Sequence, residues 1–134
     1  KGWVMGVAAA QLLSQEWMVL AVALAPFLGH LFSPFLGFSG GKGVATALGS
    51  VVGVAPLIGL LLLLAWLGAV AVWRYSSGGA LTAFGLFPLI ASLLRPTVEF
   101  VLFSVVVSGL IVAKHKGNIE RLWNGTESKI GKRP

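Results

Sequence analysis

A short glycine-rich stretch holds residues whose types and spacing suit anion chemistry. Gly40, Gly41 and Gly43 surround Lys42 between two long apolar segments. Glycines allow positive φ, so successive backbone N–H groups can point into one concavity beside the lysine cation. The helix-forming run that starts at Val44 would add the attraction of a helix N-terminus. The pattern predicts an anion site, most naturally for phosphate, and a tight interhelical turn is the alternative explanation of the same glycines.

Several other kinds of chemistry are excluded by the residues present. The loop is not a Walker A motif, because Gly43 stands where that motif needs the Ser or Thr that binds magnesium. The sequence has no cysteine, which excludes cysteine nucleophiles and cysteine metal sites. It also has no aspartate, so a His-x-x-x-x-Asp dyad is excluded, and Phe35 and Glu120 stand at that spacing after His30 and His115.

Two further polar segments could contribute to a site. The first, residues 74–79, contains Arg74, Tyr75 and Ser77, and we expect its arginine and tyrosine to be interfacial anchors. The second begins the C-terminal segment, where a helix would place His115 and Asn118 on one face. The alternative for that segment is a basic amphipathic helix lying against anionic lipid headgroups.

The composition is that of an integral membrane protein. The 134 residues are 57% hydrophobic and 10% charged, and the mean hydropathy is +0.92. The formal charge of +6 is typical of cytoplasmic loops and does not indicate nucleic acid. We predict an all-α polytopic helical bundle, a single membrane domain over residues 1–134 with a basic segment at 114–134. Its apolar runs are residues 2–13, 17–28, 44–52, 56–73, 80–94 and 98–113, giving about six spans.

Features along these runs predict their packing and sidedness. Pro56 suits the first turn of a new helix and divides the longest apolar run. Alternate crossing places Lys42, Arg74 and the C-terminal segment on one face and leaves Arg95 on the other. The excess of positive charge makes the first face cytoplasmic, so the polar motifs, His30 included, would share one cytoplasmic-side site. Small residues should let the helices pack closely, among them Gly6, Gly49, Gly59, Gly68, Gly85 and Gly109.

The motifs, taken together and in order, resemble the bacterial PlsY family of membrane glycerol-3-phosphate acyltransferases. The matching residues are Gly29-His30, Phe38-x-Gly40-Gly41-Lys42-Gly43-Val44-Ala45-Thr46-x-x-Gly49, Arg74-Tyr75-x-Ser77 and His115-x-x-Asn118-Ile119-x-Arg121-Leu122-x-x-Gly125-x-Glu127. The resemblance implies a seven-helix bundle in the bacterial inner membrane. Six of those helices would be present here, and the family's first helix and first motif would lie before Lys1.

The resemblance also implies the reaction. An acyl group would move from acyl phosphate to the 1-hydroxyl of sn-glycerol 3-phosphate, forming lysophosphatidate in phospholipid biosynthesis. The expected partners are glycerol 3-phosphate, acyl phosphate and the lipid bilayer, with no acyl-CoA, metal or cofactor. Such a site chiefly needs preorganised cations and N–H donors, because the acyl phosphate is already activated.

Residue roles follow from motif matching. Lys42, His115 and Asn118 would be catalytic, and the loop from Gly40 to Gly43 would bind phosphate together with Asn118, Ser77 and His30. His115 would act as a base or orient a substrate, and a donor phosphate oxygen is the alternative base. For His30 a structural pin of the loop is the alternative.

The resemblance also draws attention to Glu127 and Ala80. We expect Glu127 to anchor the tail through a Lys or Arg, and a catalytic role is the alternative. Ala80 replaces the last serine of the family's Arg-Tyr-x-Ser-x-x-Ser pattern.

Two other function classes remain open at this stage. A small membrane transport subunit with a cytoplasmic-side anion site would need polar residues in mid-span, whereas Glu99 lies near the end of an apolar run. A non-catalytic bundle subunit would be indifferent to changes at Lys42 and Asn118.

Overall fold

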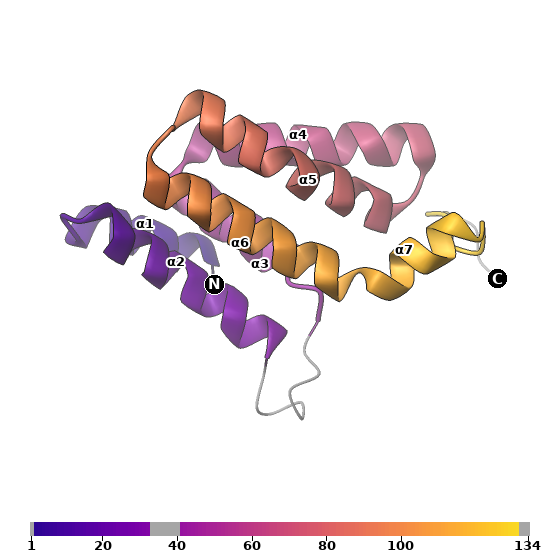
Figure 1. The fold of residues 1–134 in the computed structure, drawn as a ribbon, viewed down its shortest axis with the longest axis horizontal. Helices are drawn as coiled ribbons and strands as arrows, with labels where there is room; N and C mark the ends of the chain where they lie inside the picture. The colour runs from indigo at the N-terminus through magenta and orange to yellow at the C-terminus, as the bar shows by residue number, and fades with distance from the viewer. Residues whose placement is uncertain (1, 33–40, 132–134) are drawn as a thin grey trace.

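The computed structural model describes residues 2–32 and 41–131, and within these ranges it contains seven helices and no strand. The helices run back and forth as a bundle (Figure 1). This arrangement confirms the predicted all-helical class. Their bounds are α1 Gly2–Leu12, α2 Glu16–Leu31, α3 Val44–Val54, α4 Pro56–Trp73, α5 Ser76–Leu94, α6 Val98–Lys114 and α7 Lys116–Trp123.

Helix α5 begins four residues earlier than the sequence predicted, at Ser76 instead of Ala80. The predicted polar loop is therefore reduced to Arg74 and Tyr75 between α4 and α5. Gly79 lies inside this helix at a point where α4 passes very close to it. A Cβ at Gly79 would lie 2.8 Å from Cδ1 of Trp66, so the glycine serves close helix packing instead of a turn.

Glycines hold α1 against α3. A Cβ at Gly53 would lie 2.7 Å from the carbonyl oxygen of Trp3 and 2.9 Å from Cα of Gly6. A Cβ at Gly49 would lie 3.2 Å from the backbone nitrogen of Trp3. Backbone contact of this kind is how helices associate in lipid, and it confirms the predicted role of Gly6 and Gly49.

The other predicted packing glycines divide into two groups. Gly59 packs against α3, since a Cβ there would lie 2.5 Å from Cγ2 of Val52. The prediction is wrong for Gly68, Gly85 and Gly109, where a Cβ would meet no atom of the described residues within 4 Å. The sequence spacing of small residues does not distinguish a helix face that meets a neighbour from one that faces outward.

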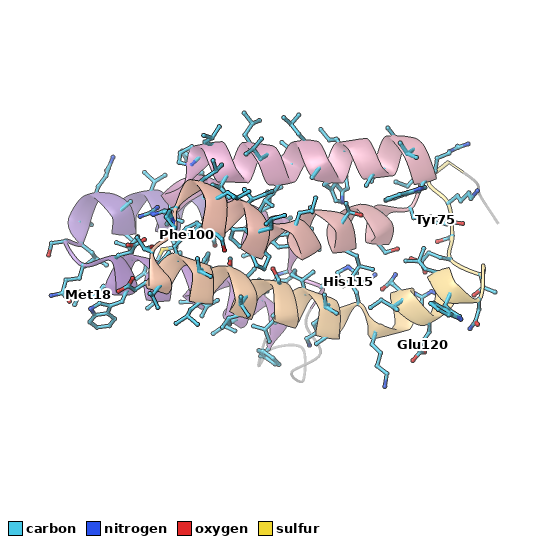
Figure 2. The ribbon with its side chains drawn as sticks, turned by 45° about the horizontal axis from the view of Figure 1, so that its top comes forward. Met18, Tyr75, Phe100, His115 and Glu120 are labelled. Carbon is cyan, nitrogen blue, oxygen red and sulfur yellow. The ribbon has the colours of Figure 1, made fainter. Side chains whose placement is uncertain are left out.

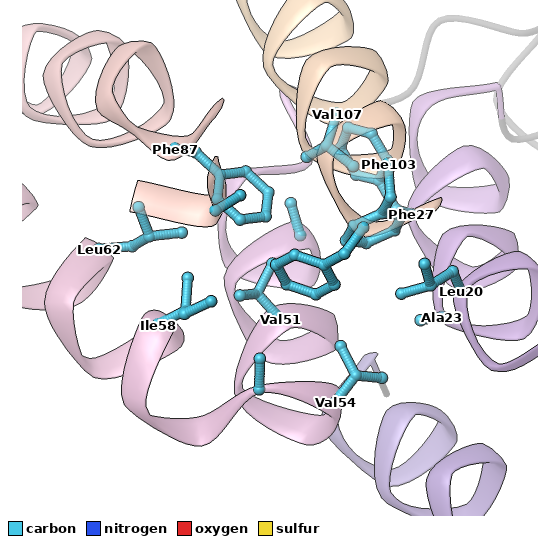
Figure 3. Packing of buried hydrophobic residues seen from close by; sticks show 14 of the residues in the cluster. Leu20, Ala23, Phe27, Val51, Val54, Ile58, Leu62, Phe87, Phe103 and Val107 are labelled. Atoms are coloured by element: carbon cyan, nitrogen blue, oxygen red, sulfur yellow. The ribbon is translucent and has the colours of Figure 1, made fainter. Parts of the chain in front are cut away.

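A cluster of phenylalanines fills the middle of the bundle (Figure 3). The ring of Phe87 on α5 lies edge-to-face with Phe84, Phe100 and Phe103 at centroid distances of 6.1, 6.0 and 6.2 Å. Edge-to-face aromatic pairs add to the stability gained from burying apolar area. Phe27 on α2 is 1% exposed and joins the same cluster, so the core connects α2, α5 and α6.

Not all helices reach the length of a full membrane span. Helices α4 and α5, with 18 and 19 residues, are each long and apolar enough to cross a membrane. Helices α6 and α7 meet the same length and hydropathy criterion only when they are taken together, as a pair bent by 61°. Helices α1, α2 and α3 are apolar but have 11, 16 and 11 residues, against the roughly 20 that a hydrocarbon core requires. Two or three of the predicted crossings therefore meet the length criterion, and the others depend on shorter apolar helices.

The two ends of the bundle differ in charge. Met18 and Phe100 lie toward one end, and Tyr75, His115 and Glu120 lie toward the other (Figure 2). At the first end Arg95 Nε lies 3.0 Å from Glu16 Oε1, and its guanidinium sits 4.9 Å from the Phe100 ring centroid. Arg95 is thus at the opposite end from the residues around His115, as alternate crossing of the helices predicted.

Candidate active site

A cavity of about 730 Å³ opens at the His115 end of the bundle. Its apolar wall comes from the start of α3, the middle of α4 and the first half of α5. Its polar side comes from the α6–α7 junction, from α7 and from the segment that follows α7. The polar and charged residues that line it are Lys42, Ser76, Ser77, His115, Asn118, Arg121, Glu127, Ser128 and Lys129.

The start of α3 has the geometry that the glycine-rich loop predicted. Gly43 is the N-cap residue and has φ +73, in the left-handed region that favours glycine. A Cβ at Gly43 would also lie 2.6 Å from the Phe27 ring, so both backbone and space require glycine. Lys42, just before it, is exposed and lines the cavity, next to the free N–H groups at the start of α3. Gly40, a predicted phosphate ligand, lies outside the described residues.

His115 is the most deeply buried polar residue of the site. It follows the last residue of α6, precedes the first residue of α7, and is 1% exposed. Its Nδ1 lies 2.7 Å from the carbonyl oxygen of Ile111. A carbonyl only accepts hydrogen bonds, so Nδ1 carries the proton and the other ring nitrogen, Nε2, is the acceptor in the neutral ring.

The environment of His115 keeps the ring neutral. Burial lowers the pKa of His115, the nearby charge of Lys42 lowers it further, and the hydrogen bond to Ile111 and the charge of Glu127 oppose this only in part. Among the described residues no hydrogen bond is made to Nε2. His115 therefore presents a neutral imidazole with an available lone pair, which can orient a hydroxyl or accept its proton.

Glu127 accepts three side-chain hydrogen bonds on the polar side of the cavity. Its Oε1 accepts from Ser77 Oγ and from Asn118 Nδ2, each at 2.6 Å, and its Oε2 accepts from Arg121 Nε at 2.7 Å. Burial alone would raise the pKa of Glu127, but hydrogen bonds from Ser77, Asn118 and Arg121 outweigh it and lower the pKa. The carboxylate is thus charged, and the predicted anchoring of the tail to a basic residue is confirmed in Arg121.

Asn118 and Ser77 still have hydrogen-bonding groups that a ligand could use. Asn118 has a second amide hydrogen beyond the one given to Glu127, so it can donate to a bound anion. Ser77 has given its only proton to Glu127, so its oxygen can act only as an acceptor, which suits a ligand hydroxyl.

The segment after α7 folds back over the turn between α4 and α5. Ile130 N donates to the Arg74 carbonyl at 2.7 Å, and Arg74 Nη2 donates to the Ile130 carbonyl at 3.0 Å. Lys129 Nζ lies 5.5 Å from the Tyr75 ring centroid. Arg74 has φ 62, an uncommon conformation for a non-glycine residue. These contacts give Arg74 and Tyr75 a role that the sequence did not predict, because they hold the tail at the cavity.

The structure brings four of the eight predicted site residues to one cavity, and Gly41 and Gly43 are not among its described lining residues. Lys42, Ser77, His115 and Asn118 all line the cavity. His30 is exposed and is not among the described lining residues. It lies instead beside Gly41, since a Cβ at Gly41 would lie 2.7 Å from His30 Nε2, which favours the alternative of a structural pin.

The sequence reasoning missed two cations of the cavity, Arg121 and Lys129. Arg121 follows Asn118 by three residues, so helical spacing alone would have placed it near the site. Lys129 reaches the cavity only because the tail folds back onto Arg74. The described lining residues include one carboxylate, Glu127, and three cations, Lys42, Arg121 and Lys129. The polar side therefore carries an excess of positive charge.

The comparisons with known proteins agree with this geometry. Residues 1–125 match the glycerol-3-phosphate acyltransferase family. The chain belongs to this family. The finding confirms the PlsY resemblance, and the transport alternative is not favoured.

Relatives and solved structures of the family cover nearly all of the chain. The glycerol-3-phosphate acyltransferase of Thiobacillus denitrificans is 45% identical over 99% of this chain and 68% of its own length. That of Methylococcus capsulatus is 47% identical over 83% of this chain and 56% of its own length. The chain thus spans between 56% and 68% of these curated relatives.

Two crystal structures of PlsY, an integral membrane glycerol 3-phosphate acyltransferase, share the fold. The lysophosphatidic acid form has a TM-score of 0.91 and the glycerol 3-phosphate form 0.92, both at 36% identity. Each covers 97% of this chain, and this chain covers 67% and 66% of them. The fold of an integral membrane acyltransferase is therefore shown.

Proposed function

We propose that this chain carries the reaction site of a membrane acyltransferase that transfers a fatty acyl group from acyl phosphate to the 1-hydroxyl of sn-glycerol 3-phosphate. One observation carries the proposal. The cavity joins a cationic polar side, with Lys42, Arg121 and Lys129, to an apolar wall built by three helices. A molecule with a phosphate at one end and an alkyl chain at the other fits both parts, and the PlsY crystal structures in glycerol 3-phosphate and lysophosphatidic acid forms support it.

The reaction needs charge stabilisation and proton transfer. The hydroxyl oxygen of glycerol 3-phosphate attacks the acyl carbon, the bond from that carbon to the phosphate oxygen breaks, and inorganic phosphate leaves. Lys42 and the N–H groups at the start of α3 would stabilise the phosphate charge in a partly desolvated site. No other activation is required, because the acyl phosphate already has a good leaving group.

His115 and its neighbours would position the attacking hydroxyl. Neutral His115 offers Nε2 as acceptor for the hydroxyl proton, and the departing phosphate is the alternative acceptor. Ser77 Oγ can accept from a second glycerol hydroxyl, and Asn118 can donate its remaining amide hydrogen to a phosphate or acyl oxygen. Glu127 would contact no substrate in this scheme and would hold Ser77 and Asn118 in place.

The same proposal places the site in the cell. Residues 1–134 form one polytopic domain of the bacterial inner membrane, with the cavity and the segment 114–134 on the cytoplasmic side. Support comes from the basic residues at the cavity end, Lys42, Arg74, Lys116, Arg121 and Lys129, which follow the positive-inside rule. Labelling of a cysteine introduced at Lys116 by an impermeant reagent should require opened cells, and labelling from outside intact cells would contradict this orientation.

A donor assay tests the proposed reaction. The complete natural polypeptide that contains this sequence, purified in detergent, is given labelled glycerol 3-phosphate with either palmitoyl phosphate or palmitoyl-CoA. We expect lysophosphatidate from the acyl phosphate alone, without added metal. Product from palmitoyl-CoA alone, or no product from a folded and monodisperse sample, would contradict the proposal.

A further inference from the structure

Lys114 joins the ends of two helices. It is the last residue of α6, and its Nζ donates to the carbonyl oxygen of Leu31, the last residue of α2, at 3.1 Å. The same ammonium lies 4.8 Å from the ring centroid of Phe32. Figure 1 shows that α2 and α6 run toward the same end of the bundle. The two contacts therefore fix the end of α2 to the end of α6, immediately before His115.

A cation suits this position because two helix C-termini meet there. The last carbonyl groups of a helix have no partner within the helix and carry a partial negative charge. In α2 the Leu28 carbonyl accepts from the Phe32 N–H at 2.9 Å, and the Leu31 carbonyl accepts from Lys114. The Phe32 ring attracts the same ammonium through a cation–π contact. An uncharged side chain of similar length at residue 114 would leave the Leu31 carbonyl without this donor.

The end of α2 supports the chain just before α3. A Cβ at Gly43 would lie 3.0 Å from Cδ2 of Leu31, so this glycine lies directly on the last turn of α2. Gly41 lies beside the same turn, because a Cβ there would lie 2.7 Å from His30 Nε2. Lys42 stands between these two glycines. Its position therefore depends on where the end of α2 is held.

Lys42 and His115 reach the cavity from different segments. Lys42 precedes α3, His115 follows α6, and both line the cavity. The two groups interact, since the charge of Lys42 lowers the pKa of His115. Lys114 connects their supports, because it precedes His115 in the chain and holds the helix end on which Gly41 and Gly43 lie.

We infer that Lys114 is a positioning residue, which fixes Lys42 relative to His115 by holding the end of α2 in place. The inference rests on the proposed function, in which Lys42 contacts the substrate phosphate and His115 the attacking hydroxyl. Lys114 would touch no substrate, and it is not among the described lining residues of the cavity. Without its donor the end of α2 should loosen, and phosphate binding should weaken because Lys42 is no longer preorganised.

A set of variants separates the hydrogen bond of Lys114 from its charge. Lys114→Met keeps an apolar stem and removes the donor. Lys114→Arg restores it, because a guanidinium can donate to a carbonyl and stack on an aromatic ring. Lys116→Met is the matched control, since it removes the same charge from an exposed side chain that does not line the cavity. Lys114→Gln is a milder second variant should Lys114→Met not insert.

The first readout is KM for glycerol 3-phosphate, measured beside kcat and Tm with the complete natural polypeptide and palmitoyl phosphate. We expect Lys114→Met to raise KM at least about tenfold, because a small misplacement of a binding group is costly. Lys114→Arg and Lys116→Met should keep the KM of the unaltered protein. An unchanged KM in Lys114→Met would overturn the inference even if Tm falls, because a merely structural contact lowers Tm alone. An equal rise of KM in Lys116→Met would overturn it too.

Hydrogen exchange tests the inference without the reaction. Deuterium uptake is followed by mass spectrometry in peptides from the end of α2 and the start of α3, where Ala47 N donates to the Gly43 carbonyl at 2.8 Å. Lys114→Met should speed exchange several-fold in both segments, and Lys114→Arg should not. If the unaltered protein forms no lysophosphatidate from acyl phosphate, the proposed function fails and exchange alone decides the inference. Unchanged exchange at the start of α3 in Lys114→Met would then overturn it.

Discussion

Replacing Glu127 by alanine removes the acceptor on which Ser77, Asn118 and Arg121 converge. Two of these hydrogen bonds, from Ser77 and Asn118 at 2.6 Å, come from buried partners, and Glu127 itself is 8% exposed in its side chain. Hydrogen bonds to a charged group contribute about 1.5–3 kcal/mol each, so their loss should cost about 3 kcal/mol or more. The Arg121 side chain is 49% exposed, so its ion pair should add less than about 1 kcal/mol.

The assay is thermal unfolding in detergent beside steady-state kinetics. A loss of about 3 kcal/mol lowers Tm by roughly 6–12 °C for a chain of this size. Because Ser77 and Asn118 would lose their orientation, kcat/KM should fall at least about tenfold, as small misplacements of positioning groups do. Glu120→Ala is the matched control, an exposed carboxylate on α7 whose side chain makes no hydrogen bond among the described residues. A Glu127→Ala protein with the Tm and kinetics of Glu120→Ala would show that Glu127 does not hold Ser77 and Asn118 in place.

Three further predictions follow from the same geometry. Lys42→Ala should raise KM for glycerol 3-phosphate at least about tenfold or abolish turnover while the protein still inserts, because a charge-assisted contact to phosphate is lost. Lys116 is exposed and outside the cavity lining, so Lys116→Ala should leave the kinetics unchanged. Equal kinetics in the two variants would exclude Lys42 from the substrate site. Gly43→Ala should destabilise the protein by about 1–3 kcal/mol, since φ of Gly43 is +73 and the Phe27 ring occupies the space that a Cβ would take. Gly68→Ala in mid-helix should be neutral or stabilising. Equal Tm values for the two variants would contradict this expectation. The pKa of His115 is lowered, so the acid limb of the kcat/KM profile should lie below about pH 6.5, and a limb above it would contradict a buried neutral imidazole.

The stability of the protein should also fall in acid. The folded state binds a proton on His115 less readily than the unfolded chain does, because the pKa of His115 is lowered on folding. Unfolding free energy should therefore decrease as pH falls from about 6.5 toward the folded pKa. Glu127, whose pKa is also lowered, stabilises the fold above its unfolded pKa and loses this contribution as pH falls through its folded value. A Tm that stays constant as pH falls from about 6.5 to about 5 would contradict the assignment for His115. A Tm that stays constant as pH falls from about 4.5 to about 3 would contradict the assignment for Glu127.

Local sequence signals predicted the helices and part of the site. Gly43 and Lys42 were placed at the start of a helix because a loop glycine and a helix-forming run are adjacent in sequence. His115 and Asn118 were placed on one face because three residues make nearly one helical turn. Pro56 fixed the start of α4 correctly, since proline is suited to the first turn.

The features that the sequence did not reveal depend on contacts between distant segments. Ser77 and Glu127 are separated by 50 residues, and nothing in either segment shows that they share a hydrogen bond. Gly79 of α5 lies close to Trp66 of α4, a contact that the local sequence does not reveal. The outward-facing Gly68 has the same local sequence character as the packed Gly59. Lys129 reaches the cavity through the pairing of Ile130 with Arg74, which only the folded tail creates.

The proposed function requires one cavity to hold both the phosphate and the acyl chain. The direct test is a structure of the complete natural polypeptide with bound lysophosphatidate. We predict the phosphate beside Lys42 and His115, with the alkyl chain against the apolar wall formed by α3, α4 and α5. A lysophosphatidate bound with its phosphate at the Glu16–Arg95 end, or with its chain outside the cavity against the outer face of α4, would contradict this requirement.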